Sequence, residues 1–145
     1  MQPIAAAIIK SKQGYVLIEA LLAVALFAFM VTTLASAVLY GQQNTAMAGN
    51  RVQAVLVADE GLEAARALAN VDFANLVVGE HGLVVVDNHW ALSGISDVTG
   101  MFTRSLLVTN AGAGRQDVTV TVTWQQSATR TGTVTSYSRL TDWAN

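Results

Sequence analysis

The chain has 145 residues, of which 52% are hydrophobic and 12% charged, and its mean hydropathy is +0.43. This composition argues against an intrinsically disordered chain, and a formal net charge of −2 excludes a strongly basic surface for nucleic acid. Because the chain has no cysteine, it cannot form disulfide bonds, thiolate zinc sites or lipidated cysteines.

Residues 15–40 form one apolar stretch, YVLIEALLAVALFAFMVTTLASAVLY, in which Glu19 is the only charged side chain. At about 1.5 Å per residue, a helix of this length reaches about 39 Å, which is enough to cross a hydrocarbon core of about 30 Å. Lys10 and Lys12 precede the stretch, and no acidic residue occurs before Glu19. The positive-inside rule therefore predicts a protein of the cytoplasmic membrane, with its N-terminus inside and its C-terminus outside.

Two other interpretations of this stretch stay open. Residues 35–37, Ala-Ser-Ala, provide a cleavage signal of the kind that follows a secretory signal peptide. Alternatively, the stretch is an ordinary anchor that holds an unrelated external binding domain. Neither interpretation explains Glu19, because an ionised side chain inside a membrane helix costs about 2.5 to 3.5 kcal/mol and usually marks a function or a partner.

Residues 12–27, KQGYVLIEALLAVALF, resemble the class III signal of type IV prepilins and of the related pseudopilins of secretion and competence systems. In that family a basic leader ends in glycine, an aromatic residue follows, and a glutamate stands fifth in the mature chain. Gly14, Tyr15 and Glu19 match these three markers. The sequence departs from the family in having tyrosine in place of the commoner phenylalanine, and in lacking proline after Pro3.

The resemblance implies that a prepilin peptidase cleaves after Gly14 and that the same enzyme, acting as an N-methyltransferase, modifies Tyr15. It also implies that the mature chain joins other pilin subunits at an assembly platform in the inner membrane. Glycine suits the cleavage position because a residue without a side chain allows the closest approach of another backbone.

Cleavage would also supply a counterion for Glu19. It would remove Lys10 and Lys12 with the leader and expose the α-amine of Tyr15, whose ordinary pKa of about 8 keeps it mostly cationic at neutral pH. If that amine belongs to a neighbouring subunit, pairing with Glu19 offsets the desolvation of both charges. The pair would then set the axial register between adjacent chains.

Residues 41–70 are predicted to continue the helix outside the membrane and to end near Asn70. The predicted apolar face of this half has hydrophobic residues near helical spacing, and the acidic residues lie toward solvent. Glycines in the stretch predict local fraying within residues 41–50. The residues assigned to the apolar face are Val52, Val55, Leu56, Leu62, Ala65 and Leu68.

From about Leu76 the sequence changes to short β-prone runs separated by turn residues. The predicted strands are residues 82–86, 102–109, 117–125 and 132–140, the last three forming an antiparallel meander with turns at 110–117 and 126–130. Helix followed by sheet predicts an α+β class. The predicted division is a leader (1–14), a membrane and assembly helix (15–40), the outer half of the helix (41–70) and a small β-rich head (71–145). The resemblance implies a pilin-like packing of the head on the helix.

No other pattern points to chemistry with comparable strength. His81 and His89 lack a third ligand at a diagnostic spacing, and residues 97–100 lack the acid density of a calcium loop. A core role is favoured over an exposed aromatic patch for Trp90, Trp124 and Trp143. We therefore expect no catalysis, no cofactor and no metal.

The functional hypothesis from the sequence is a structural subunit, either a minor pilin or a pseudopilin. It would serve a type IV pilus or a filament of the type II secretion or competence kind, located first in the cytoplasmic membrane and then in an extracellular or periplasmic filament. The alternative is an exported or membrane-anchored binding domain with an ordinary signal peptide or signal anchor. Whether the chain binds nucleic acid is left open.

Overall fold

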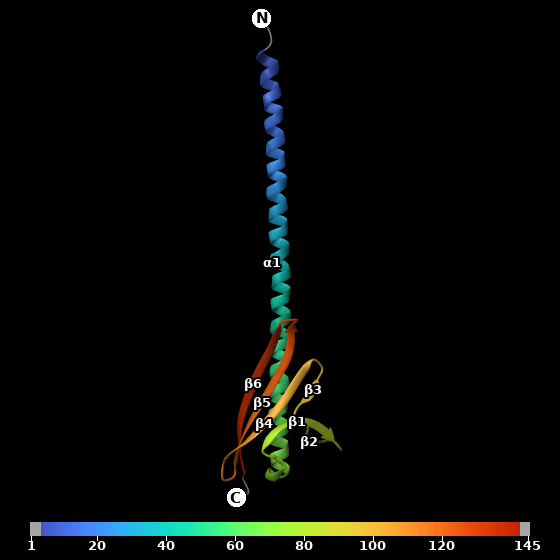
Figure 1. Cartoon of the computed structure of the whole chain (residues 1–145), viewed down its shortest axis with the longest axis vertical. Helices are drawn as coiled ribbons and strands as arrows, with labels where there is room; N and C mark the ends of the chain where they lie inside the picture. Colours follow the sequence, from blue (N-terminus) through green and yellow to red (C-terminus); the bar gives the residue numbers. More distant parts are fainter. Residues whose placement is uncertain (1–3, 143–145) are drawn as a thin grey trace. The chain divides into compact units, whose positions relative to one another are not determined.

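The computed structural model describes the backbone of residues 4–142 and the side chains of residues 15–142. A long helix, α1 (Ile4–Val71), is followed by a short 3-10 helix, η1 (Phe73–Asn75), and then by strands (Figure 1). Contacts divide the chain into two compact units, Met1–Thr45 and Ala46–Asn145.

In the first unit, every residue from Tyr15 to Thr45 is helical and exposed. α1 continues through Gly41 and Gly49, so the helix has no break where fraying was predicted, within residues 41–50. The reason is helix cooperativity: each glycine weakens the helix by about 1 kcal/mol, but an interruption would require a second, costly nucleation. The predicted end at Asn70 lies one residue before the observed end at Val71.

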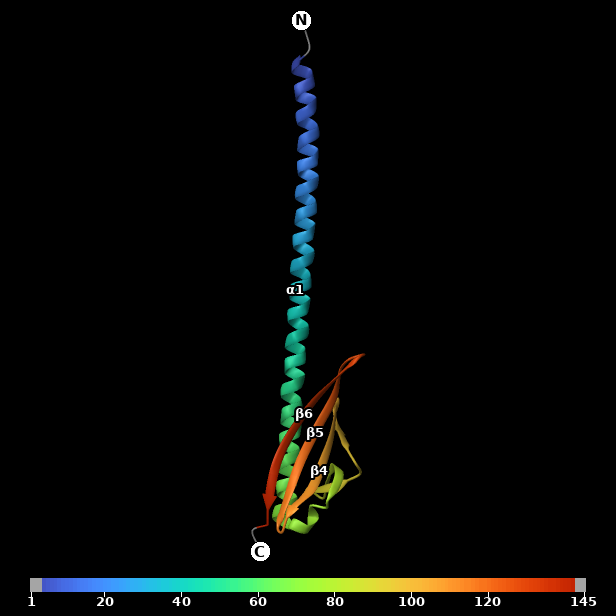
Figure 2. The same cartoon turned by 60° about the vertical axis from the view of Figure 1, so that its left-hand side comes forward.

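The second unit contains an antiparallel sheet of six strands in the order β2-β1-β4-β5-β6, with β3 paired to β4. Figures 1 and 2 show β4, β5 and β6 beside the last part of α1. The α+β layout of a long helix packed against an antiparallel sheet is therefore confirmed. The strands are β1 (Gly79–Val86), β2 (His89–Ser93), β3 (Asp97–Thr99), β4 (Phe102–Gly112), β5 (Arg115–Ser127) and β6 (Arg130–Thr141).

All four predicted strands are present, and the meander of β4, β5 and β6 is confirmed. The predicted turns at 110–117 and 126–130 are too long, because each strand pair closes over only two residues, 113–114 and 128–129. Positive φ angles at Gly112 and Gly114 allow the tighter first turn. β2 and β3 were not predicted.

The core lies between the last turns of α1 and the sheet. Small residues dominate the helix side, and branched residues of β4 and β5 face them. The predicted apolar face is right for Leu62, Ala65 and Leu68, but wrong for Val52, Val55 and Leu56, which are exposed. The buried members of the core on α1 are Ala54, Ala58, Leu62, Ala64, Ala65 and Leu68, and on β4 and β5 they are Phe102, Leu106, Val108, Val118, Val120, Val122 and Trp124.

Close approach explains why small residues occupy the buried helix face. A Cβ atom on Gly61 would lie 3.0 Å from Cγ1 of Val120 and 3.1 Å from Cδ of Arg104. Large side chains at this point would hold the sheet away from the helix. The hydrophobic pattern that favoured Val52 and Leu56 therefore pointed to the wrong face.

We expect Gly61→Val to lower the free energy of unfolding of the head by about 1 to 3 kcal/mol, because the added methyl groups overpack this contact. Gly49→Val is the matched control, since a Cβ atom on Gly49 meets nothing within 4 Å. Urea unfolding followed by tryptophan fluorescence measures the free energy of unfolding of both variants. Equal effects of the two substitutions would contradict the packing described for Gly61.

Candidate functional site

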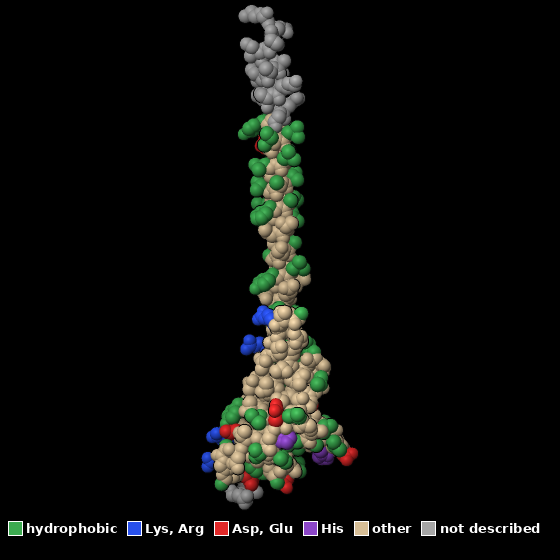
Figure 3. Space-filling model, viewed as in Figure 1, with side chains coloured by type: hydrophobic (Ala, Val, Ile, Leu, Met, Phe, Trp, Pro, Cys, Tyr) green, Lys and Arg blue, Asp and Glu red, His purple; other side chains and the backbone are tan. Residues whose placement is uncertain are grey.

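Tyr15 and Glu19, two residues of the prepilin-like motif, lie on a part of α1 that packs against no other element of its own unit. Tyr15 is 74% exposed and Glu19 is also exposed. Because residues four apart on a helix lie on the same face, with about 5 to 6 Å between their Cβ atoms, Glu19 lies one turn from Tyr15 on one side of the helix. Figure 3 shows hydrophobic side chains distributed along this segment.

The threonine and serine hydroxyl groups within residues 15–40 donate to carbonyl oxygens of their own helix. Thr32 Oγ1 donates to the carbonyl oxygen of Phe29 at 2.9 Å, and Ser36 Oγ donates to that of Thr32 at 2.8 Å. Thr33 Oγ1 donates to the carbonyl oxygen of Met30 at 2.8 Å. These bonds satisfy polar groups that would otherwise be costly to place in an apolar environment.

Glu19 differs from these residues. Within the described part of the chain its carboxylate has no hydrogen bond and no ion pair. A carboxylate surrounded by apolar side chains needs a cation or hydrogen-bond donors from outside its own helix once water is removed. Glu19 is therefore the group of this segment whose chemistry calls for an external partner.

By length and composition, α1 qualifies as a membrane-crossing helix, with a mean hydropathy of 2.3 over its most apolar window. None of that window is buried, which sets it apart from the core helix of a soluble protein. A signal sequence near an N-terminus can have the same length and the same apolar composition. Lys10, Lys12 and Gly14 lie outside the residues whose side chains the structure describes, so the leader and the cleavage position remain predictions.

The head contains a buried ion cluster that the sequence analysis missed. Arg104 on β4 is only 3% exposed. Its Nε and Nη2 atoms donate to the two carboxylate oxygens of Asp97 at 3.2 and 2.9 Å, and Nη1 donates to the carbonyl oxygen of Val57 at 3.2 Å. Glu60 adds a second carboxylate 3.5 Å from Nη1. The cluster ties β3 and β4 to α1.

Asp97 is therefore engaged by Arg104 and is not part of an acid-rich calcium loop. The two histidines contact backbone carbonyl oxygens: His81 Nε2 lies 2.9 Å from Val77 O, and His89 Nδ1 lies 2.8 Å from Asp87 O. Among the described residues, no group of three or more His, Cys, Asp or Glu side chains is placed to hold a metal.

Trp124 is buried and packs edge-on against Phe102, with ring centroids 5.8 Å apart, as a core role requires. Trp90 is half-buried against the same core. Trp143 lies outside the described residues. The two described tryptophans therefore do not form an open aromatic patch.

A second ion pair lies across β5 and β6, on the surface. Arg139 Nε donates to Asp117 Oδ1 at 2.6 Å, and Nη2 donates to Oδ2 at 2.9 Å. The hydrogen bonds from Arg139 lower the pKa of Asp117 to about 2, with a smaller contribution from Tyr137, and the same carboxylate raises the pKa of Tyr137. The pair therefore favours the ionised form of Asp117 in the folded head.

We expect Arg139→Gln to weaken the head at neutral pH and to remove part of its acid sensitivity. A carboxylate whose folded pKa lies below its unfolded value of about 3.9 stabilises the fold above that value, and the stabilisation is lost as the pH falls toward 2. The difference between wild type and variant in urea midpoint should thus shrink between pH 4 and pH 2. Arg130→Gln, on the same strand, is the control, and a constant difference across this range would contradict the assignment.

Comparison with protein-family models, with curated proteins and with solved structures finds no match to this chain.

Proposed function

We propose that this chain is a structural subunit, a minor pilin or a pseudopilin, of a type IV pilus or of a related secretion or competence filament. Its precursor resides in the cytoplasmic membrane with the N-terminus inside. A prepilin peptidase removes residues 1–14 and methylates Tyr15, and the subunit then joins a filament through α1. The observation that carries this proposal is Glu19, an acid that has no partner among the described residues, on an exposed apolar helix and fifth after the glycine of the motif.

The apolar segment suits two successive environments. Before assembly, its exposed side chains face lipid, and its threonine and serine hydroxyl groups are satisfied within the helix. After assembly, the same side chains pack against sister helices. Small residues at Ala20, Ala23, Ala25 and Ala28 allow close approach between helices, as in other helix contacts formed in membranes.

A neighbouring subunit supplies the partner that Glu19 lacks among the described residues. After cleavage, the α-amine of Tyr15 carries a positive charge near neutral pH. Pairing between this amine and Glu19 of the adjacent chain removes two unpaired charges from the apolar interior at once. Since only one axial offset between parallel helices brings these groups together, the pair sets the register of each added subunit.

The mature N-terminus tests the proposal directly. We expect mass spectrometry of the protein purified from its native host to find a chain that begins at N-methylated Tyr15. A chain that begins at Val38 would instead identify a signal peptide, and an intact Met1 would identify a plain anchor. Either result would support the alternative of an exported or anchored binding domain and would overturn this proposal.

A further inference from the structure

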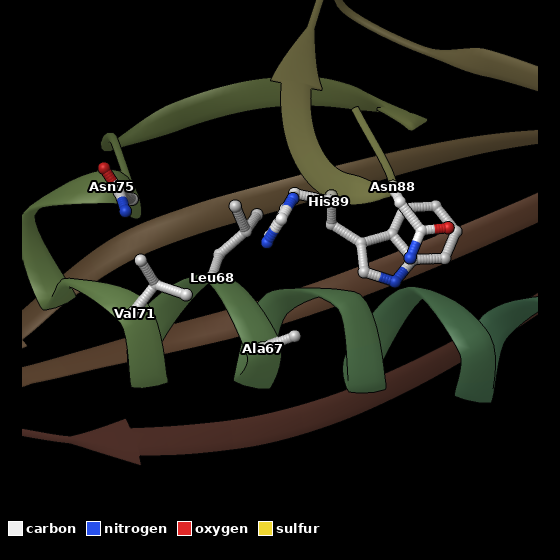
Figure 4. A pocket seen from close by; sticks show the side chains of 7 residues that line it. Ala67, Leu68, Val71, Asn75, Asn88 and His89 are labelled. Atoms are coloured by element: carbon white, nitrogen blue, oxygen red, sulfur yellow. The ribbon is translucent and has the colours of Figure 1, made fainter. Parts of the chain in front are cut away.

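The head has a hollow of about 320 Å³ between the last turns of α1 and the turn that joins β1 to β2. Leu68, Val71 and Trp90 provide its apolar lining. Figure 4 shows the side chains of Asn75 and Asn88 at its two ends, with His89 and Leu68 between them. The hollow lies entirely within the second unit, Ala46–Asn145.

Local backbone geometry positions the polar side chains. Asp87 and Asn88 have φ angles of 49° and 62°, which fit the two central residues of a tight hairpin turn between the paired residues Val86 and His89. On the opposite side, Oδ1 of Asp72 accepts a hydrogen bond from the backbone N–H of Ala74 at 2.9 Å and caps η1, in which Asn75 is the last residue. The amides are thus presented by two ordered turns.

The indole ring of Trp90, which forms the aromatic wall of the hollow, is also held in place. The guanidinium carbon of Arg104 lies 6.0 Å from the ring centroid of Trp90, within the range of a cation–π contact. Because Arg104 is itself bonded to Asp97 and to Val57, the indole packs on a rigid ion cluster. A fixed wall lowers the entropy lost when a ligand binds.

The polar lining indicates a neutral ligand with several hydroxyl groups, because none of the described residues that line the hollow is Lys, Arg, Asp or Glu. Within the described residues, the side-chain amides of Asn75 and Asn88 have no hydrogen-bond partner, and each offers donors and an acceptor. His89 Nδ1 lies against the carbonyl oxygen of Asp87, so in the neutral ring it carries the proton and Nε2 is left as an acceptor.

We infer that this hollow binds one neutral pyranose ring of a glycan, with the apolar face of the sugar against Leu68, Val71 and Trp90. Asn75, Asn88 and His89 then exchange hydrogen bonds with its hydroxyl groups. The volume lies near the lower end of the usual range for small-molecule sites, about 300 to 1,000 Å³, which suits a single ring. A purely apolar ligand fits less well, because it would cover the amides without bonding to them.

A second hollow of the head serves as an internal comparison. It has about 310 Å³ and is lined by Arg66, Arg139, Asn70 and neighbouring residues of α1 and β6. Its two guanidinium groups are engaged by Glu63 and Asp117. This hollow lacks an aromatic wall and has charged groups, so it is not expected to bind a neutral sugar.

The test uses the full chain in lauryldimethylamine oxide micelles, a detergent without a sugar headgroup. Saturation-transfer NMR is recorded with the methyl pyranosides of glucose, galactose, mannose and N-acetylglucosamine. We expect at least one of them to bind with a Kd on the order of 1 mM, as is reasonable for so few ligand atoms. Absence of binding by all four at about 50 mM, or binding of indole but of no glycoside, would overturn the inference.

Variants then locate the site. The double variant Asn75→Ala with Asn88→Gly removes both amides, while glycine at position 88 keeps the positive φ angle of the turn. We expect its affinity to fall at least about tenfold. Asn70→Ala, the same kind of truncation at the second hollow, should leave affinity unchanged. Unchanged binding in the double variant would place the sugar elsewhere. These outcomes do not depend on filament assembly, so the two proposals fail separately.

Discussion

Replacement of Glu19 by alanine is expected to reduce incorporation of the subunit into filaments by about two to four orders of magnitude. Removing one partner of a buried ion pair typically costs about 3 to 5 kcal/mol, because the other charge stays buried and unpaired. In the proposed filament, the charge left unpaired would be the α-amine of Tyr15 on the adjacent chain. The proposed cleavage after Gly14 lies five residues before Glu19, so we expect the variant still to be processed.

Two comparisons isolate the charge. Glu19→Gln keeps the shape and a hydrogen-bonding oxygen but loses the ionic partner, and should be defective nearly to the same degree. Glu63→Ala removes an exposed acid of α1 that pairs with Arg66 in the second unit, and should be incorporated normally. The measurement is the ratio of subunit in sheared filaments to subunit in membranes, with the N-terminus checked by mass spectrometry. Normal incorporation of Glu19→Ala would contradict the assembly role.

The long elements were predictable because their patterns are strong and local. Residues 15–40 contain a single charge, and the end predicted at Asn70 differs from Val71 by one residue. The alternation of Val118, Val120 and Val122 with threonines predicts β5, and these valines are fully buried. In such segments, local propensity and tertiary packing favour the same structure.

The missed elements are those whose stability comes from distant partners. β3 has only three residues, and it is held by pairing with β4 and by the bonds of Asp97 to Arg104 and to the backbone N–H of Leu83. The predicted apolar face of α1 included Val52, Val55 and Leu56, which are exposed, and omitted Ala54 and Ala58, which are fully buried because proximity to the sheet selects small residues there. Such preferences depend on tertiary packing and are not visible in a hydrophobic pattern.

The two candidate sites also differ in whether their residues are local in the sequence. Tyr15 and Glu19 belong to a contiguous motif, so sequence alone identifies them, and the structure adds that they share an exposed helix face and that Glu19 has no described partner. The hollow beside Trp90 combines side chains of α1, η1 and the β1–β2 hairpin. No spacing rule brings together residues from three separate elements.

The buried position of Arg104 is indicated by the pattern of hydrophobic residues in the sequence. In β4 the inward positions Phe102, Leu106 and Val108 alternate with more exposed ones, and Arg104 falls on the inward side of this alternation. A buried arginine requires paired carboxylates and satisfied donors, since an unpaired charge in the core is too costly. The pattern therefore identifies a position where a partner acid must exist, although it does not say which acid.

Arg104→Met is expected to lower the free energy of unfolding of the head by about 3 to 5 kcal/mol, because it leaves Asp97 without its guanidinium partner in a largely buried site. For a head of this size the midpoint of thermal unfolding should fall by more than about 10 °C. Arg139→Gln, which breaks an exposed pair, should have a much smaller effect. Thermal unfolding in detergent, followed by tryptophan fluorescence, measures the midpoints of the wild type, Arg104→Met and Arg139→Gln.

A second substitution separates the unpaired charge from the lost packing. Asp97→Asn in the Arg104→Met background removes the orphaned carboxylate, while the amide oxygen can still accept the hydrogen bond from the backbone N–H of Leu83. The double variant should therefore be more stable than Arg104→Met alone, although less stable than the wild type. If the double variant were less stable than the single one, the carboxylate would not be the source of the loss, and the cluster would act through packing of the arginine stem against α1.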